Sequence, residues 1–301
     1  MMSRNFLAFD IGGTNIKYGL LNHSGNLIKK EAIETPHDGL DSFLKTIKKI
    51  IRDNKNLFRG VCFSVPGTID HTNEMIYGGG NLTFLDHQSF PELLDLDDSI
   101  PVTVENDGKA AALAELWLGN LKGVQNGAAI TLGTGIGGGI IVNNKLVYGK
   151  HFQAGELSFM VDWKSFNEKD MLGTSGSAIL MIKEVAEVLG LPNKKDGKAV
   201  FSAINASDSR IMPIFTNYCR TIAALINNVQ MVIGGERFVI AGGISAQKIL
   251  VNTIEKEYTN IREQIPILNS TIKEAEIMEA RFHNDANLYG ALYHMLLEND
   301  N

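Results

Sequence analysis

The sequence predicts an α/β protein built from two similar halves, each a mixed sheet with helices, and a cleft between the halves. One plan of strand, Gly/Thr turn, strand, polar turn and strand appears in "FLAFDIGGTNIKYGLLNHSGNLIKK" and again in "AAITLGTGIGGGIIVNNKLVYG". Helix-like segments and a further strand follow each copy. Because clefts between domains are favoured ligand sites, the duplication also predicts where a small molecule binds.

The first half begins with β-rich runs at 5–10, 18–22 and 27–33, separated by Gly-Gly and Ser-Gly turns. These runs predict three consecutive antiparallel strands. A helix is predicted over 40–52, where apolar residues recur at spacings of three and four. These residues are Leu40, Phe43, Leu44, Ile47 and Ile51. The strand "GVCFSV" then ends at Pro66-Gly67, and the chain is loop-rich until the strand "VTVE".

After the second copy, helices are predicted at 177–189, 211–233 and 245–258, with the strand "RFVIAGGIS" between the last two. The last segment, 285–298, has one apolar helical face formed by Leu288, Ala291, Leu292 and Met295. No low-complexity linker marks a boundary. We expect an N-terminal domain over 1–108, with the helix 285–298 packing back on it, and a C-terminal domain over 109–284.

Composition limits the possible partners. The chain has 301 residues, of which 44% are apolar, enough for a substantial core. A net charge of −6 without a Lys/Arg stripe argues against a nucleic-acid partner. The start "MMSRNFLAFDIGG" has no long apolar run, so we expect no membrane partner. Cys62 and Cys219 lie in separate apolar contexts typical of buried thiols in a reducing compartment. We therefore expect a soluble, cytoplasmic protein that binds small molecules and forms a homodimer.

The two Gly/Thr turns are either tight hairpins or phosphate cradles. "GTGIGGG" formally matches GxGxxG, but a β-branched run follows it instead of the helix that a dinucleotide fingerprint requires. Gly12-Gly13-Thr14 and Gly133-Thr134-Gly135 occupy matched places in the two halves. Glycine permits close approach of an anion, which N–H groups and a Thr hydroxyl can then hold. Asp10 precedes the first turn and suits a Mg²⁺ site, although an Asp there is usually a turn former.

Asn106 and Asp107 lie between a strand and a helix in "VTVENDGKAAALAE". Such residues commonly cap helices, which contributes about 1 kcal/mol. From these residues alone, capping is the favoured interpretation.

Six ordered segments resemble a known family: "DIGGTNIKYGLL", "PGTID", "ENDGKAAALAE", "LGTGIGGGII", "AGELSFM" and "AGGIS". Their order and spacing are similar to those of the ROK sugar kinases, a branch of the actin-like ATPase (ribonuclease H-like) fold. The resemblance covers essentially the whole chain. It implies an ATP-dependent carbohydrate kinase that phosphorylates the 6-hydroxyl of a hexose, an N-acetylhexosamine such as N-acetylmannosamine, or a β-glucoside.

The resemblance also implies roles for individual residues. Asp107 would be the general base that takes the proton from the sugar hydroxyl, which is compatible with capping. The implied sugar-binding residues are Gly67, Asn81, Asn106, Asp107 and Glu156. The implied ATP-binding residues are Asp10, Gly12, Gly13, Thr14, Asn15, Lys17, Gly133, Thr134, Gly135, Gly242 and Gly243, with Asp10 holding Mg²⁺ through water.

The chain departs from the family at its structural zinc site. Where many members have one His and three Cys, this chain has Phe159, Asp170, Leu172 and Ser177, and Ile179 replaces a Glu. We therefore expect no structural zinc. The histidines show no metal-ligand spacing and are interpreted as ordinary residues: His23, His37, His71, His87, His151, His283 and His294.

The same replacements affect the sugar site, because the missing His and Glu contact the sugar in family members. The chain is thus most similar to the branch without zinc, which includes N-acetylmannosamine and β-glucoside kinases, and the choice of sugar stays open. A sugar-responsive repressor is the alternative function. Repressors of this family carry an additional N-terminal helix-turn-helix, whereas here the first strand is expected near residue 5. Intact turns, Asp10 and Asp107 favour a kinase over an inactive sensor.

Overall fold

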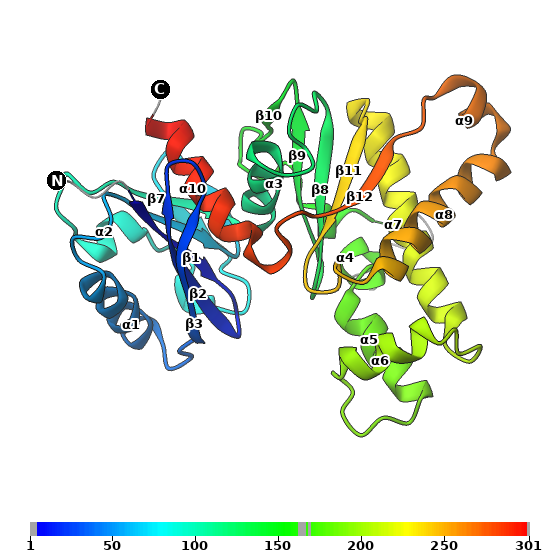
Figure 1. Cartoon of the computed structure of the whole chain (residues 1–301), viewed down its shortest axis with the longest axis horizontal. Helices are drawn as coiled ribbons and strands as arrows, with labels where there is room; N and C mark the ends of the chain where they lie inside the picture. The colour runs from blue at the N-terminus through cyan, green and yellow to red at the C-terminus, as the bar shows by residue number, and fades with distance from the viewer. Residues whose placement is uncertain (1–4, 162–166, 168–169, 300–301) are drawn as a thin grey trace. The chain divides into compact units, whose positions relative to one another are not determined.

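The structure, a computed structural model, describes residues 5–161, 167 and 170–299 (Figure 1). The chain forms two compact units. Unit 1 consists of Met1–Gly119, Leu146–Ala154 and Asn284–Asn301, and unit 2 of Asn120–Lys145 and Gly155–His283. Unit 1 therefore includes the segments that surround residue 108 and the helix predicted at 285–298.

Unit 1 contains a five-stranded mixed sheet with the strand order β3-β2-β1-β4-β7. Its strands are β1 (Asn5–Ile11), β2 (Asn15–Asn22), β3 (Leu27–Glu34), β4 (Val61–Val65) and β7 (Val102–Asn106). β1, β2 and β3 pair antiparallel, and β1, β4 and β7 pair parallel. The three antiparallel strands predicted from the N-terminal segment are confirmed.

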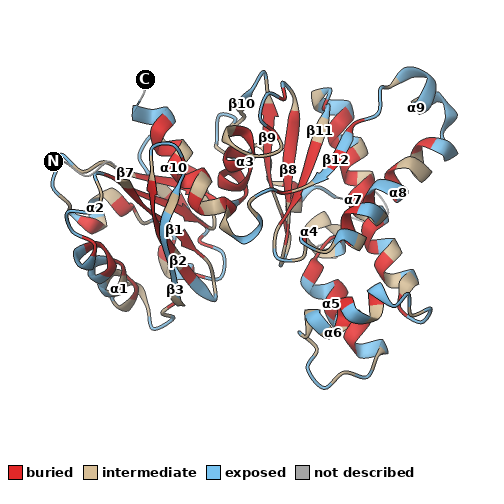
Figure 2. Ribbon diagram, viewed as in Figure 1, coloured by how far each residue is buried: buried red, intermediate tan, exposed pale blue. Residues whose placement is uncertain are grey.

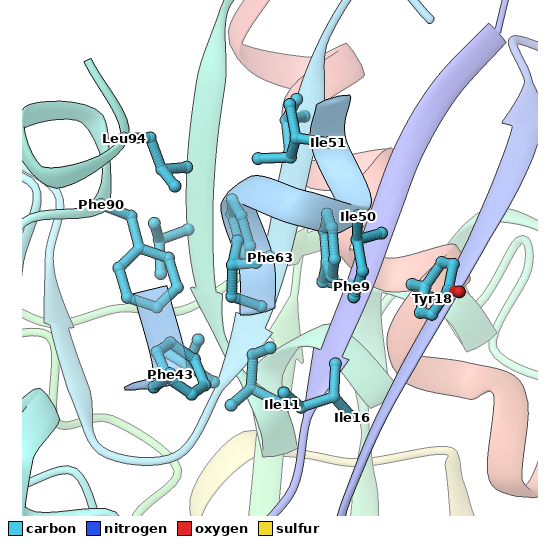
Figure 3. Close-up of a cluster of buried hydrophobic side chains, with 14 of the residues drawn as sticks. Phe9, Ile11, Ile16, Tyr18, Phe43, Ile50, Ile51, Phe63, Phe90 and Leu94 are labelled. Atoms are coloured by element: carbon cyan, nitrogen blue, oxygen red, sulfur yellow. The ribbon is translucent and has the colours of Figure 1, made fainter. Parts of the chain in front are cut away.

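Strands β1, β4 and β7 are buried on both faces, whereas the edge strand β3 is largely exposed (Figure 2). Because successive side chains of a strand point to opposite sides, each face needs its own cover. On one side lie α1 (Leu40–Asp53) and α2 (Phe90–Leu94). Phe63 is central there, with its ring 4.8 Å from that of Phe9 and 4.7 Å from that of Phe90 (Figure 3). The prediction of a helix over 40–52 is confirmed.

The other side of the sheet is covered by α10 (Ala286–Asn299), which also packs against α3 (Asp107–Trp117). Leu288, Leu292 and Met295 of α10 are buried against Phe6 and neighbouring residues of the sheet. The apolar face predicted for 285–298 is therefore the face that α10 buries.

The segment between β4 and β7 is more ordered than the sequence indicated. It contains the two-stranded sheet of β5 (Thr68–Asp70) and β6 (Met75–Tyr77), and the 3₁₀ turn η1 (Thr83–Leu85). Three-residue elements are too short to show a hydrophobic period, so the sequence pattern does not distinguish them from loop.

Unit 2 repeats the strand plan of unit 1 in the order β10-β9-β8-β11-β12. Its strands are β8 (Gly127–Leu132), β9 (Ile136–Val142), β10 (Lys145–Leu146), β11 (Arg237–Ala241) and β12 (Glu276–Glu279). β8 pairs antiparallel with β9 and parallel with β11, which pairs parallel with β12. The predicted duplication of mixed sheets is confirmed, and β12 is the strand that the sequence analysis missed.

The helices of unit 2 are α4 (Leu172–Ser175), α5 (Ala178–Val188), α6 (Gly197–Asn205), α7 (Met212–Ile233), α8 (Lys248–Gln264) and α9 (Pro266–Thr271). The predictions at 177–189 and 211–233 are confirmed, whereas the helix predicted at 245–258 is shifted to 248–264. Within the described part of the chain, no helix has the length and apolar character needed to cross a membrane.

Candidate active site

At the junction of β7 and α3, the helix is capped by Asn106 and not by the Asp107 carboxylate. Asn106 is the N-cap, since its Oδ1 accepts the Lys109 N–H at 3.0 Å. Its Nδ2 donates to Gly67 O at 2.8 Å and to Asp107 Oδ1 at 3.1 Å. Asp107 is exposed in the first turn of α3, and its Oδ1 also accepts the Gly108 N–H at 2.8 Å. Asn106 therefore caps α3, and the dipole of α3 favours a negative charge at Asp107.

The backbone of Gly67 lies close to the backbone at the end of β6 and the start of the loop that follows it. Its φ is +102°, and a Cβ there would be 2.6 Å from Tyr77 O and 2.9 Å from Gly78 O. The same loop ends at the exposed Asn81, whose Cβ would be 3.4 Å from a Cβ on Gly13. Within unit 1, Asn106 is therefore linked through Gly67 and the loop to the first glycine turn.

A pair of matched substitutions tests this close approach. Gly67→Ala is expected to lower the free energy of unfolding by about 2–3 kcal/mol, because positive φ and a backbone clash combine. Gly78→Ala is the control, since Gly78 has a φ of +67° but no atom within 4 Å of its Cβ position. It should cost only about 1–2 kcal/mol. Equal losses in urea unfolding would show that Gly67 is needed for its φ alone.

The turn between β1 and β2 is held from its sides by a buried threonine. Gly12 N–H donates to Asn15 O at 3.0 Å. Thr35 Oγ1 donates to Gly12 O at 2.7 Å, and Thr35 N–H donates to Thr14 O at 3.0 Å. The side chains of Thr14 and Asn15 are left exposed. The turn is thus rigid yet presents polar groups outward.

Asp10 is buried at the end of β1 and uses both carboxylate oxygens. Lys17 Nζ lies 3.0 Å from Oδ2, and Asn287 Nδ2 of α10 donates to Oδ1 at 2.9 Å. Lys17 also donates to Asn284 O at 2.9 Å. A carboxylate oxygen has the capacity to accept more than one hydrogen bond, so these contacts are compatible with a Mg²⁺-bound water. Asn287 was not found from the sequence.

In unit 2, three of the predicted glycines gather at the turn between β8 and β9. Gly133 N–H donates to Gly135 O, and Gly133 O accepts the Ala178 N–H from the start of α5, both at 3.0 Å. Gly242 has a φ of +99°, and a Cβ there would overlap the Leu132 backbone. Thr134 and Gly243 are exposed. The second turn is therefore packed against the end of β11 and the first turn of α5.

Ser158 was missed by the sequence analysis although it closes this turn. Its Oγ accepts the Ile136 N–H at 2.9 Å and donates to Ile136 O at 3.1 Å. A Cβ on Gly135 would lie 2.7 Å from that hydroxyl, which explains the need for glycine there. Glu156 is half-buried two residues earlier, in unit 2, whereas the other predicted sugar-binding residues are in unit 1.

Three of the positions at which the chain departs from the family are capping or exposed residues in the structure. Ser177 is buried and caps α5, with its Oγ accepting the Leu180 N–H at 3.2 Å. Phe159 and Ile179 are 68% and 46% exposed, so neither apolar side chain is part of the core of unit 2.

One polar cluster places two of the seven histidines beside a buried carboxylate in unit 1. His71 and His294 lie beside Glu105, the residue before Asn106. Glu105 is fully buried, its Oε1 accepts the Asn106 N–H at 2.7 Å, and the Tyr148 hydroxyl donates to Oε2 at 2.6 Å. The sequence feature that could have indicated this cluster is Glu105 itself, a carboxylate within a strand that is buried on both faces.

Electrostatics support an ionised Glu105 beside a protonated phenol. Burial alone would raise the pKa of the Glu105 carboxyl, but His294, His71 and Tyr148 outweigh it and hold that pKa below its ordinary value. Burial and the Glu105 carboxylate together raise the pKa of the Tyr148 hydroxyl, which stays a hydrogen-bond donor.

Comparison with known proteins decides the family. The model described as "ROK family" matches residues 6–163 and 172–297. The chain belongs to the ROK family. This confirms the resemblance carried by the six sequence segments, and the expected actin-like ATPase fold with it.

ROK relatives match the chain over nearly its full length. A β-glucoside kinase of Listeria monocytogenes is 30% identical and covers 97% of both chains. A glucokinase of Halalkalibacterium halodurans is 29% identical over 96% of this chain and 94% of the relative. The crystal structure of a ROK family protein from Streptococcus pneumoniae, in complex with sucrose, matches with a TM-score of 0.87 and 27% identity. That match covers 98% of this chain and 99% of the other.

Proposed function

We propose that this ROK protein is an ATP-dependent sugar kinase that transfers the γ-phosphate to a sugar 6-hydroxyl, with Asp107 as general base. The observation that carries the proposal is that capping and the exposed carboxylate belong to two different residues at the start of α3. Asn106 caps the helix, so the exposed carboxylate of Asp107 is not required as the cap. Asn106 Nδ2 donates a hydrogen bond to Gly67 O beside it, which joins two of the proposed sugar-binding residues.

The two glycine turns supply the proposed phosphate-binding groups. Each closes an antiparallel strand pair at the same place in its sheet, and each leaves a threonine exposed, Thr14 in unit 1 and Thr134 in unit 2. Backbone N–H groups and hydroxyls at such turns bind phosphate oxygens without a net positive charge. Gly242 and Gly243 follow β11 and would lie beside the adenosine.

Asp10 fits a water-mediated Mg²⁺ site. It is a carboxylate at a strand end, adjacent to the turn, and Lys17 and Asn287 hold it in one orientation. Mg²⁺ characteristically keeps several waters and takes few protein carboxylates. When bound, the ion would neutralise negative charge on the phosphates.

Unit 2 is proposed to lack the structural zinc found in other members. Phe159, Asp170, Leu172 and Ser177 offer neither thiol nor imidazole at the expected positions. Ser177 instead caps α5.

The substrate is proposed to be a sugar modified near C1 or C2. A site that hydrogen-bonds a hydroxyl discriminates strongly against sugars lacking it, and an apolar replacement relaxes that demand. Phe159 and Ile179 are such replacements, and both are exposed. The relative named as a β-glucoside kinase supports the larger substrates. If Phe159 instead fills the part of the sugar site near C1, a bulky aglycone is excluded and the smaller N-acetylmannosamine is favoured.

One assay of ADP release with a panel of sugars tests both the kinase activity and the substrate preference. ADP release with Mg-ATP is expected with cellobiose or N-acetylmannosamine at least as efficiently as with glucose, measured as kcat/KM under one condition. A preference above about tenfold for glucose over both, or roughly 1.4 kcal/mol in transition-state binding, would contradict the substrate proposal. No sugar-dependent ADP release across hexoses, N-acetylhexosamines and glucosides would contradict the kinase itself.

A further inference from the structure

His71, Glu105 and His294 converge in unit 1 from three separate elements. His71 follows β5 directly, Glu105 belongs to β7, and His294 lies on the buried side of α10. β5 and α10 both contact β7. The three potential ligand atoms lie within 4.8 Å of one another. No sequence spacing predicted this cluster.

The distances inside the cluster do not suit direct hydrogen bonds. His71 Nε2 lies 3.6 Å from Glu105 Oε1, and His294 Nδ1 lies 3.4 Å from Glu105 Oε2. Hydrogen bonds to nitrogen are usually about 2.7–3.2 Å long. His71 Nε2 is buried and has no hydrogen-bond partner in the described part of the chain. Leaving such a group unsatisfied costs about 1–3 kcal/mol.

The same distances suit ligands that surround one ion. Zinc bonds to imidazole nitrogen and carboxylate oxygen are about 2.0–2.2 Å long, which places two ligands of a tetrahedron about 3.3–3.6 Å apart. The separation of each imidazole nitrogen from its nearer Glu105 oxygen falls near this range, and all three ligand atoms lie within 4.8 Å of one another, so a small inward shift would complete the set. An ion at the centre would give the unpartnered His71 nitrogen a partner.

The groups behind the three side chains are those that support a metal site. His294 Nε2, on the far side of the ring from Glu105, lies 3.3 Å from Glu298 Oε1 but, like His71 Nε2, has no hydrogen-bond partner in the described part of the chain. A carboxylate that accepts a hydrogen bond from the far nitrogen of a ligating histidine fixes its orientation and raises its basicity, and Glu298 is near enough to do so. The Tyr148 hydroxyl holds Glu105 Oε2 and lies 3.4 Å from His294 Nδ1. The rings of Tyr148 and Phe152 lie against His71, with centroids 4.9 and 5.3 Å away.

We propose that His71 Nε2, the Glu105 carboxylate and His294 Nδ1 bind one Zn²⁺ ion, with water as fourth ligand. Two imidazoles and one carboxylate suit Zn²⁺, whereas Mg²⁺ and Ca²⁺ prefer oxygen ligands. The site is in unit 1, while the positions that hold zinc in other members correspond to residues of unit 2.

The ion would position the start of α3. Glu105 Oε1 accepts the Asn106 N–H, so fixing the carboxylate also fixes the end of β7 that carries Asn106 and Asp107. It would also join β7 to α10 and to the loop after β5. The inference concerns binding and stability, and it does not rest on the proposed kinase activity.

Titration of the metal alone tests the site. Tag-free protein treated with a chelator and dialysed should bind one Zn²⁺ per chain by calorimetry, with Mg²⁺ in excess, at a Kd of about 1 μM or tighter. Zn²⁺ should also raise its Tm, since a ligand that binds only the folded state stabilises it. Co²⁺ should give the visible absorption bands of a four-coordinate ion.

Matched variants assign the ligands. His71→Asn and Glu105→Gln should each weaken Zn²⁺ binding at least tenfold and abolish the rise in Tm, while far-UV circular dichroism shows that they fold. His23→Asn, which changes an exposed histidine between β2 and β3, should bind like the wild type. The proposal is overturned if wild-type protein takes up no Zn²⁺, if Mg²⁺ in excess displaces it, or if both variants bind it equally well.

Discussion

Asp107→Asn is expected to lower kcat about 10²- to 10⁴-fold, the usual contribution of a general base. The amide cannot accept the proton of the sugar hydroxyl, although it has nearly the same shape and can still accept the Gly108 N–H. Asn106 continues to cap α3, so the expected loss of stability is small and includes the interaction of the carboxylate with the helix dipole. That interaction is worth about 0.3–1 kcal/mol.

Steady-state ADP release and thermal unfolding of the same preparations measure the two effects separately. Asp98→Asn is the matched control, because it removes one negative charge from an exposed carboxylate elsewhere in unit 1. It should alter neither kcat nor Tm appreciably. Near-normal turnover of Asp107→Asn would assign the carboxylate a local structural role and remove it from the reaction.

Gly290→Ala is expected to destabilise unit 1 by about 3 kcal/mol, the upper part of the range for overpacking. Gly290 lies in α10 where it crosses α3, and a Cβ there would overlap the carbonyl oxygen of Ala110. Backbone cannot move aside as a flexible side chain can, so the two helices must separate. Alanine favours a helix over glycine by about 1 kcal/mol, which offsets only part of this cost.

Gly197→Ala is the control for the intrinsic helix preference. Gly197 begins α6, and a Cβ there would meet only Ile182 Cδ1 at 3.4 Å. Urea unfolding should show a near-neutral or small effect for this variant and a large loss for Gly290→Ala. Because α3 carries Asp107, Gly290→Ala should also lower kcat. Equal stability of the two variants would mean that α10 and α3 are not in close contact.

The sequence determined the parts of this protein that depend on local pattern. The spacing of Leu40, Phe43 and Ile47 is a property of one helix, and it predicted α1. The repeated strand and Gly/Thr pattern predicted both mixed sheets, because each hairpin is a contiguous segment. Ordered segments spread over the whole chain likewise identified the family, and with it Asp107, Asp10 and both turns as candidate site residues.

Only the tertiary structure decided which distant side chains meet. His71, Glu105, Tyr148 and His294 are separated by tens of residues or more, and no period relates them. Their contact depends on β5 and α10 both packing on β7, and on residues 146–154 joining unit 1. Asn287 reaches Asp10 for the same reason. Periodicity reports which face of an element is buried but not which element covers it, since that choice is made by packing between segments far apart in the chain.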